Sequence, residues 1–500
     1  MTQDKQSEMW KALPWKKFRK ETFRLQKRIY EASRNNNIVR VLYLQKLLFT
    51  SYGARMLAIR QVTQLNSGKK TAGIDGKSSL TVKQRFLLEQ ELFREGMKWQ
   101  HMGVKEVKIP KPDGTFRPLK IPTIRDRAWQ CLVKLVLEPA HEAKFHSRSY
   151  GFRPGRCAHD AQKMIFCHLK SNSNGKSKRI LELDIEKCFD RINHITIMEN
   201  VIAPRFIKSG LYKCLKVGTD LDFPDQGTPQ GGVISPLLAN IALNGIEDIH
   251  TSVRYADDMV LILKPHDNED VILSNITKFL AQRGMNIKLN KTRLIQATSG
   301  FDFLGWHFSV CQSGKFICRP SKTNYTNLKK KIKNLINNST IKINDRISKI
   351  TPVVRGWRNY HIYCDLSRHD LWELDNYVYK KIVKNTIYSK EDSIKLVRKA
   401  FPKIGYLTNR FVNVKQDKSP YDGDFDYWSK RKGKLYHNIT SRLLQKQSYI
   451  CSYCNLKFND DEIIHLHHID GNHNNWSSYN LTVMHKSCHQ YLHSPQMQSI

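Results

Sequence analysis

The sequence predicts an α+β fold divided over several domains. At 500 residues, the chain is long enough for about three or more domains of ordinary size. Between about residue 105 and residue 310, short β-rich runs alternate with helical ones, and residues 321–338 follow as a strongly basic helical stretch. The final segment, 441–500, gathers Cys and His at close spacing, which predicts a small unit held together by metal.

The charge balance indicates the kind of partner. Lys and Arg number 83 against 45 Asp and Glu, which leaves a formal net charge of +38. A small-molecule enzyme needs far less charge for solubility, so a polyanion, and nucleic acid in particular, is the simplest partner. Because 40% of the residues are hydrophobic and 10% are aromatic, the chain is too apolar to be a disordered polycation.

The sequence predicts neither a membrane partner nor secretion. No apolar run approaches the roughly 18 residues of a membrane-spanning helix, and the first residues, MTQDKQSEMW, lack the apolar core of a secretory signal. Eight of the 11 cysteines are scattered singly between Cys131 and Cys364, which is typical of a reducing compartment. Abundant Lys, Asn and Ile indicate an AT-rich genome, and we expect a plastid or the bacterial cytoplasm.

The segment PWKKFRKETFRLQKRIY (14–30) predicts a basic amphipathic helix. Trp15, Phe18, Leu25 and Ile29 recur at helical spacing, and Lys and Arg fill the other faces. Two interpretations stay open and are compatible: the helix packs on the body of the protein, or its basic face contacts RNA.

Three carboxylates form the first candidate site. The segment ILELDIEKCFDRINH (180–194) begins as a strand that carries Glu182 and Asp184 on one face. VRYADDMVLIL (253–263) predicts two strands joined by a tight turn, with Asp257 and Asp258 at its tip. An Asp-Asp pair alone is more often a solvated turn. Beside apolar strands, however, adjacent carboxylates are costly without a cation, and two Mg²⁺ ions held by Asp184 and Asp257 would suit phosphoryl transfer.

The surrounding blocks carry a resemblance to a known family. The segment YADD resembles the catalytic hairpin of reverse transcriptases, and seven blocks in one order over about 200 residues resemble the group II intron-encoded members. Besides the two carboxylate segments, the blocks are IPKPDGTFRPLKIPTIRDRAWQ (109–130), SYGFRPGRCAHDA (149–161), QGTPQGGVISPLLANIALN (226–244), LNKTRL (289–294) and FDFLGW (301–306).

The resemblance implies a right-hand polymerase, with fingers, a palm built on an antiparallel sheet, and a helical thumb. Asp184 and Asp257 match its metal-binding aspartates, and Asp258 matches the third, which we expect to be a less direct ligand. Phe189 matches the bulky residue under the incoming sugar, where a ring would clash with a 2′-hydroxyl and select dNTPs; the alternative is a core aromatic.

Four further residues match positions that contact the nucleotide in this family. Lys111 and Arg117 match finger residues that grip the triphosphate, which suits their charge. Gln230 matches a residue that touches the nucleotide, and Lys291 matches a lysine that protonates the leaving pyrophosphate. For any single lysine, the alternative is a solvated surface charge.

The middle of the chain resembles a thumb followed by a maturase (X) region. The helix at 321–338, SKTNYTNLKKKIKNLINN, places Leu328, Ile332 and Leu335 on one stripe. In ITPVVRGWRNYHIY (350–363), cations are mixed with aromatic rings, which suits structured RNA. These residues are Arg355, Trp357, Arg358 and Tyr360, and the alternative is that the two aromatic rings belong to the thumb core.

The tail has the spacing of a zinc site. Cys451-x2-Cys454 is followed after 30 residues by His485-x2-Cys488. Each knuckle presents two ligands to one tetrahedral ion, so the four residues predict a closed structural Cys3His site for Zn²⁺.

Between the knuckles, HLHHIDGNHNNWSSYNLTVMHKSCHQYLH (465–493) resembles an HNH nuclease of ββα-metal type. The resemblance implies three metal ligands, a general base and an Asn that holds the loop and orients the base. The implied metal ligands are His467, His489 and His493. The implied general base is His468, and the implied orienting residue is Asn480. Many HNH sites carry Glu where this chain has His465, so the ligand set and the identity of the divalent metal stay open. We expect the other extra histidine, His473, on an exposed loop.

The domain interpretation has five parts. They are a basic helical extension (1–60), fingers and palm (61–310), thumb and maturase region (311–395), a turn-rich linker or DNA-binding region (396–440) and the HNH domain (441–500).

The family implies a cycle in which the protein binds group II intron RNA, assists splicing, nicks a DNA target and primes reverse transcription there. An RNA-binding splicing maturase with inactive enzyme domains is the alternative. The intact YADD and HNH blocks count against it. A reverse transcriptase of a defence or diversity-generating system, or a generic HNH nuclease, fits fewer of the blocks. The oligomeric state is left open.

Overall fold

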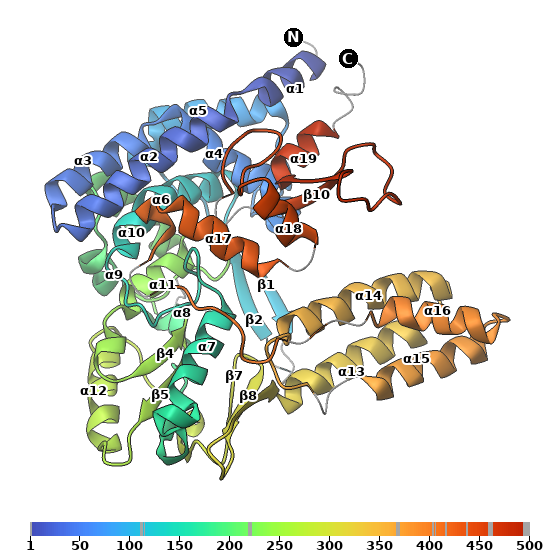
Figure 1. The fold of residues 1–500 in the computed structure, drawn as a ribbon. Coiled ribbons are helices and arrows are strands. Elements are labelled where there is room, and N and C mark those ends of the chain that lie inside the picture. The colour runs from blue at the N-terminus through green and yellow to red at the C-terminus, as the bar shows by residue number, and fades with distance from the viewer. Residues whose placement is uncertain are drawn as a thin grey trace.

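The computed structural model describes residues 3–110, 114, 116–218, 223–366, 371–402, 405, 407–415, 418–436, 439–458 and 464–493. Helices and antiparallel sheets are mixed along the chain, so the predicted α+β composition is confirmed. Figure 1 places the N-terminal helices at one end, the central sheet at the other and a helical thumb projecting to the side.

The N-terminal helices form a layer over the long helix α6. The layer consists of α1 (Gln3–Ala12), α2 (Trp15–Arg34), α3 (Ile38–Phe49), α4 (Tyr52–Arg60) and α5 (Val82–Glu95), packed around α6 (Ile124–Glu142). The predicted helix at 14–30 is confirmed, with Phe18, Leu25 and Ile29 on its buried face. Gln26 Nε2 donates to the Leu135 carbonyl of α6 at 2.9 Å. Packing on the body therefore accounts for one face of α2.

A four-stranded antiparallel sheet in the order β4-β5-β3-β6 separates two apolar cores. Met259 and Leu261 of β5 face one core, and Val260 and Ile262 face the other. This explains the unbroken apolar run after YADD, because alternate side chains of a strand point to opposite faces. The strands are β3 (Arg179–Leu183), β4 (Ser252–Tyr255), β5 (Asp258–Leu263) and β6 (Arg293–Gln296).

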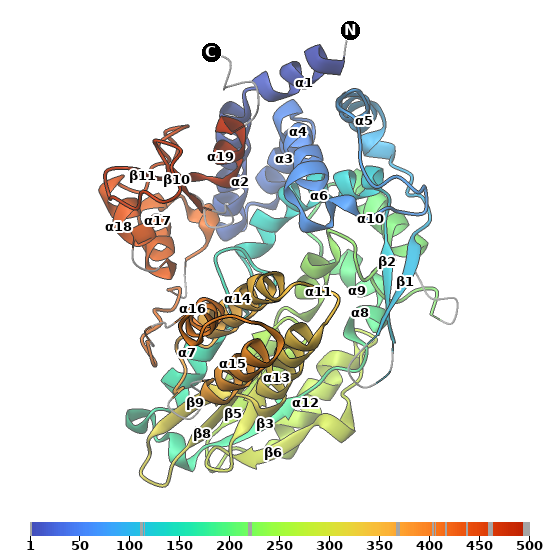
Figure 2. The same ribbon diagram turned by 90° about the vertical axis from the view of Figure 1, so that its right-hand side faces the viewer.

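Helices surround this sheet, and two smaller sheets flank it. The helices are α7 (Ala158–Leu169), α8 (Cys188–Arg191), α9 (His194–Asn200), α10 (Arg205–Val217), α11 (Ser235–Leu243) and α12 (Glu269–Ala281). An exposed hairpin of β1 (Lys105–Pro110) and β2 (Phe116–Ile121) stands at one side (Figure 2). The other small sheet has three strands in the order β7 (Phe301–Phe303), β8 (Trp306–Val310) and β9 (Phe316–Pro320).

Four helices form the thumb: α13 (Lys322–Asn337), α14 (Ile343–Tyr360), α15 (Trp372–Asn385) and α16 (Lys390–Ala400). The predicted basic helix is confirmed as α13. Leu328 and Ile332 are buried as expected, but Ile336 completes the stripe, and Leu335 is only partly buried at its edge. The thumb therefore has a core of its own.

The segment after the thumb is more than a connector. It contains the short helix η8 (Pro420–Asp422), which packs on α2, and α17 (Phe425–Leu435), which packs on α18 of the C-terminal unit, and side chains of both helices bond to the polymerase region. Arg431 Nη2 donates to both carboxylate oxygens of the fully buried Asp160, at 2.8 and 2.7 Å. The Tyr421 hydroxyl donates to Glu138 Oε2 at 2.8 Å. These bonds join residues more than 250 positions apart in the chain, so turn-rich composition alone does not reveal them.

The C-terminal unit consists of α18 (Ile439–Lys446), an antiparallel pair of β10 (Ile464–His468) and β11 (Leu481–His485), and α19 (Lys486–Leu492). Arg19 of α2 reaches Cys454 Sγ at 3.9 Å, which brings the N-terminal layer against this unit. Within the described ranges, no helix has both the length and the apolar character needed to cross a membrane.

Candidate functional site

The three predicted aspartates meet at one end of the central sheet. Asp184 directly follows β3, Asp257 lies in the β4-β5 turn, and Asp258 is the first residue of β5. Because β3 and β5 pair antiparallel with Leu183 opposite Met259, the next step along the ladder brings Asp184 opposite Asp258. The predicted hairpin is thus confirmed, with its acidic tip beside the end of the first acidic strand.

A buried guanidinium supports the turn. Arg254 of β4 is fully buried, and its Nε donates to Glu247 Oε1 at 2.6 Å. Its Nη1 donates to Asn240 Oδ1 and to the Ala256 carbonyl, both at 3.0 Å. Ala256 has a positive φ of 60°, which costs a non-glycine residue about 1–2 kcal/mol. The Arg254 hydrogen bond therefore helps to hold a strained residue immediately before Asp257.

The loop containing Gly151 lies against the same turn. Asn240 Nδ2 donates to the Gly151 carbonyl at 2.9 Å, and the Tyr150 amide donates to the Arg254 carbonyl at 2.9 Å. A Cβ at Gly151 would overlap the backbone nitrogen of Ala256. Only glycine allows the two backbones to approach so closely.

Electrostatics at the tip indicate a site for cations. Burial raises the pKa of Asp257, and the Asp184 charge raises it further. Withdrawal from water and the charges of Asp257 and Asp184 raise the pKa of Asp258 to about 6, although its side chain keeps access to solvent. Lys291 Nζ lies 2.9 Å from Asp184 Oδ2. A cation thus already balances one carboxylate, so the residues fit the Mg²⁺ expected from the resemblance.

The carboxylate oxygens of the three aspartates lie farther apart than the ligand atoms of two other clusters, which consist of Cys and His residues in the C-terminal unit. Among the described residues, only those two groups have three or more ligand atoms within 4.8 Å of one another. The three aspartates do not form such a group, and repulsion between like charges opposes their closer approach.

Three of the predicted nucleotide-contacting residues, Phe189, Gln230 and Arg117, have contacts or charge effects that the structure describes. Phe189 is half-buried and meets Phe152 edge-on, with ring centroids 6.4 Å apart. Gln230 Nε2 donates to the Asp190 carboxylate at 3.3 Å. Arg117 lies exposed on β2, and its charge lowers the pKa of Asp257 against the effect of burial. The predicted triphosphate residue Lys111 lies outside the described residues.

The four predicted zinc ligands come together in the C-terminal unit. The ligand atoms of Cys451, Cys454, His485 and Cys488 all lie within 4.8 Å of one another. Cys454 Sγ is 3.3 Å from His485 Nδ1. Hydrogen bonds from Cys454 and then Cys488 hold the pKa of the Cys451 thiol below its ordinary value. A thiolate among soft and imidazole donors is compatible with Zn²⁺.

The three predicted HNH metal ligands also form one cluster. His467 of β10, His489 of α19 and His493 just after it have ligand atoms within 4.8 Å of one another. His493 Nε2 lies 3.1 Å from His467 Nδ1. The ring of His465 lies 5.1 Å from that of His489, but it is not part of the cluster. Three imidazoles can hold one divalent ion, so the donor set fits a metal.

The predicted general base His468 follows His467 on β10, and two aromatic rings lie close to its own ring. It is buried, and its ring centroid lies 5.3 Å from that of Trp476 and 4.9 Å from that of the exposed His473. Asn480 holds the loop after β10: its Oδ1 accepts from the Asp470 amide at 3.0 Å, and its Nδ2 donates to Asp470 Oδ1 at 2.8 Å.

Sequence reasoning missed four residues that support these sites: Arg254, Gly151, Phe152 and Trp476. Only Arg254 carried a usable signal. A charged residue in an otherwise apolar strand predicts a buried partner, and Glu247 is that partner. The others act through contacts between distant segments, which no local pattern encodes.

Comparisons with known proteins agree with these observations. Residues 109–308 match the family profile "Reverse transcriptase (RNA-dependent DNA polymerase)". Residues 10–92 match "N-terminal domain of reverse transcriptase" and residues 325–389 match "Group II intron, maturase-specific domain". Maturase-like protein 1 of Euglena gracilis is 38% identical over 354 residues, covering 70% of this chain and 77% of that protein. The chain belongs to the group II intron maturase and reverse transcriptase family.

Two further comparisons are weaker. The group II intron-encoded protein LtrA of Lactococcus lactis subsp. cremoris is 35% identical over 195 residues, covering 36% of this chain and 31% of that protein. The alignment with a telomerase structure from Candida albicans covers 61% of this chain and 62% of that chain, at 16% identity and a TM-score of 0.30, which is too low to carry an argument.

Membership of the maturase family implies that this chain binds intron RNA, and its reverse transcriptase domain implies use of a divalent ion. The C-terminal nuclease interpretation stays a prediction.

Gly151→Ala tests the support of the acidic turn. The added methyl group must displace the Ala256–Asp257 backbone, so we expect primer extension to slow by about 100-fold, as misplacement of a reacting group does. Circular dichroism checks that the fold is retained. Gly103→Ala is the matched control, because its Cβ would meet only Ile74 Cδ1, at an ordinary 3.5 Å. Equal activity of the two variants would contradict the role of Gly151.

Proposed function

We propose that the chain is an active RNA-directed DNA polymerase whose reaction centre is Asp184, Asp257 and Asp258. One observation carries the proposal: three carboxylates converge at the end of one sheet, where burial and like charge raise the pKa of two of them. Such a costly arrangement is expected where cations and phosphates bind. Two bound Mg²⁺ ions would supply charge neutralisation for the attacking and leaving oxygens.

The chain's own residues then perform the remaining tasks. Phe189 and Phe152, packed edge-on, present rings that exclude a 2′-hydroxyl and so favour dNTPs. Gln230, tied to Asp190, and the exposed Arg117 orient the nucleotide, together with Lys111. Lys291, which lies 2.9 Å from Asp184, would give a proton to the leaving pyrophosphate.

Asp257→Asn tests the polymerase assignment. Loss of the carboxylate charge weakens cation binding at the reaction centre, and we expect RNA-templated primer extension to fall by about 100-fold or more. Asp302→Asn, on the exposed face of β7, is the matched control and should retain full activity. If Asp257→Asn and the parent protein extend primers equally, the assignment is wrong. If the parent protein itself is inactive, the alternative of a splicing maturase with inactive enzyme domains is favoured.

A second candidate function, an HNH endonuclease, is favoured by the imidazole cluster of His467, His489 and His493. A divalent ion bound there would polarise the scissile phosphate. His468 would accept the proton of the attacking water, with Trp476 beside its ring. Asn480 would keep the loop, and with it the base, in position.

His468→Ala tests the general base. Because general-base catalysis typically contributes about 10²–10⁴-fold, we expect nicking of DNA by the ribonucleoprotein to fall by at least about 100-fold. The DNA would carry the insertion site of the intron. His266→Ala, an exposed histidine outside the C-terminal unit, should nick at the parental rate. Undiminished nicking by His468→Ala would remove His468 from the mechanism.

We further propose that Cys451, Cys454, His485 and Cys488 hold a structural Zn²⁺. Metal analysis of the purified full chain should find tightly bound zinc that is lost in Cys451→Ser, because a closed four-ligand site needs each thiolate. Cys311→Ser, at a half-buried cysteine outside the cluster, should keep the metal. Equal zinc content in both variants would contradict the site.

Together these activities describe intron homing. The protein would assist splicing of its group II intron RNA, the HNH unit would nick one strand of a DNA target, and the polymerase would copy the intron RNA from the freed 3′-hydroxyl. A plastid or a bacterial cytoplasm is the setting that we propose.

A further inference from the structure

One stripe of the basic helix α2 faces the C-terminal part of the chain. Arg19, Phe23 and Lys27 follow one another at intervals of four residues, so they lie along one face of the helix. All three side chains are half-buried, whereas Lys20 and Arg24 next to them in the sequence are exposed. Both ribbon views place the C-terminal unit alongside α2 (Figures 1 and 2). The stripe is therefore a second contact surface of α2, besides the apolar face that packs on α6.

Two residues of the stripe hold the segment that precedes the C-terminal unit. The ring of Phe23 lies against the ring of Phe425 at the start of α17, with centroids 5.0 Å apart. The Lys27 side chain lies over Gly423, the residue after η8, where a Cβ would overlap it. Gly423 has a positive φ of 81°, so glycine both permits the turn and leaves room for Lys27. Neither of these two contacts involves a metal ligand.

Arg19, the remaining residue of the stripe, reaches the predicted zinc site. Its Nη2 lies 3.9 Å from Sγ of Cys454, whose ligand atom is grouped with those of the other three predicted zinc ligands. Zn²⁺ bound by three thiolates and a neutral imidazole carries one net negative charge. The half-buried Arg19 guanidinium offsets this charge. Bound metal also keeps Cys454 deprotonated and fixes the turn that presents its sulfur.

We propose that this zinc site is a metal-dependent dock: Zn²⁺ holds the turn around Cys454 in the form that Arg19 binds, and so seats the C-terminal unit on α2 beside the polymerase region. This role rests on the structural Zn²⁺ proposed above and adds a task to it. Arg19 is a positioning residue, since it contacts a metal ligand and not the metal. Loss of zinc would release the candidate nuclease from the N-terminal layer.

The dock also divides the basic surface of α2. Arg19 and Lys27 serve contacts within the protein, while the exposed Lys20 and Arg24 stay open to a partner. Because linked equilibria are reciprocal, the factor by which zinc strengthens docking is also the factor by which docking through Arg19 strengthens zinc binding. Metal affinity and docking can therefore be measured separately and must change together.

The first arm of the test measures metal affinity in the full chain by titration with Co²⁺. Cobalt bound by thiolates absorbs in the near ultraviolet and cobalt bound by imidazoles alone does not, so the signal separates the cysteine site from the His467 cluster. Arg19→Gln should weaken Co²⁺ binding, and Zn²⁺ binding measured by displacement, about tenfold, as loss of a partner of a metal ligand does. Arg19→Lys keeps the charge and should bind both ions more tightly than Arg19→Gln.

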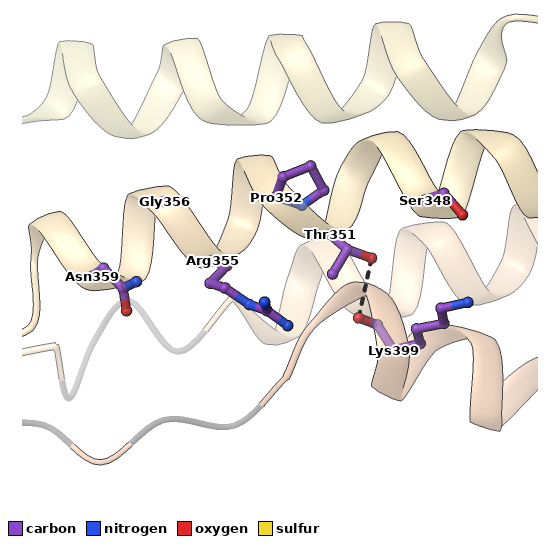
Figure 3. A pocket seen from close by; sticks show the side chains of 7 residues that line it. All are labelled: Ser348, Thr351, Pro352, Arg355, Gly356, Asn359 and Lys399. Atoms are coloured by element: carbon purple, nitrogen blue, oxygen red, sulfur yellow. Dashed lines mark hydrogen bonds between the residues drawn. The ribbon is translucent and has the colours of Figure 1, made fainter. Parts of the chain in front are cut away.

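Two control variants separate the effect of Arg19 from loss of charge alone, which matters in a chain of net charge +38. Arg24→Gln removes an exposed cation of the same helix outside the stripe. Arg355→Gln removes one from the thumb, where Arg355 and Lys399 line a groove of about 410 Å³ (Figure 3). Both controls should bind Co²⁺ as the parent protein does. Equal losses in Arg19→Gln and in either control would overturn the dock.

The second arm measures docking by hydroxyl-radical footprinting of the full chain with mass spectrometry. Removal of zinc with a chelator should raise oxidation of the Phe23 and Phe425 rings several-fold, with the exposed ring of Phe93 on α5 as the reference for radical dose. Unchanged protection of Phe23 in the zinc-free chain would overturn the dock.

The two arms also distinguish this role from the zinc site on which it rests. A parent protein that binds no Zn²⁺ would overturn the zinc site and the dock together. A parent protein that binds Zn²⁺ with the same affinity as Arg19→Gln would leave the zinc site in place and overturn the dock alone.

Discussion

The acidic candidate site depends on the buried ion pair between Arg254 and Glu247. Both side chains are fully buried, and breaking such a pair by removing one partner costs about 3–5 kcal/mol because a charge is left without compensation. The same guanidinium bonds Asn240 and the Ala256 carbonyl, so α11, β4 and the turn are joined through one side chain. The Arg254–Glu247 pair therefore fixes the conformation of the turn that precedes Asp258 and contains Asp257. It does so although the aspartates repel one another.

The large positive charge of the chain serves two different purposes. Some of it is internal: Arg254, Arg358 and Arg431 are buried and committed to carboxylates or carbonyls of the protein. The rest faces solvent, as Arg355 and Lys399 do. Net charge thus indicates a nucleic-acid partner, but it does not distinguish the side chains that could contact nucleic acid from those that are buried in the protein. In the maturase block only Arg355 of the four predicted RNA readers is exposed. Tyr360 stacks on Trp306 with centroids 4.6 Å apart, and Trp357 donates to Asn324 at 2.7 Å.

The segment after the thumb connects regions that sequence order separates. Arg431 neutralises Asp160 of α7, and Trp428 covers Gly155, where a side chain would overlap its ring. Arg19 of α2 reaches Cys454. The C-terminal unit is therefore anchored on the polymerase region through α17 and on the N-terminal layer through α2, which places a candidate nuclease beside a polymerase in one molecule.

The sequence by itself determined the features that are local in the chain. The strand–turn–strand around YADD, the paired Cys and His knuckles and the basic amphipathic helices α2 and α13 were predicted and are present, because each depends on the spacing of neighbouring residues. Only the tertiary structure decided which residues are buried and by what. The role of Gly151 under the acidic turn, the stacking of Tyr360 on Trp306, the burial of Arg358 and the docking of α17 all follow from contacts between segments far apart in sequence. Such contacts are set by how whole elements pack, and no local period or spacing encodes them.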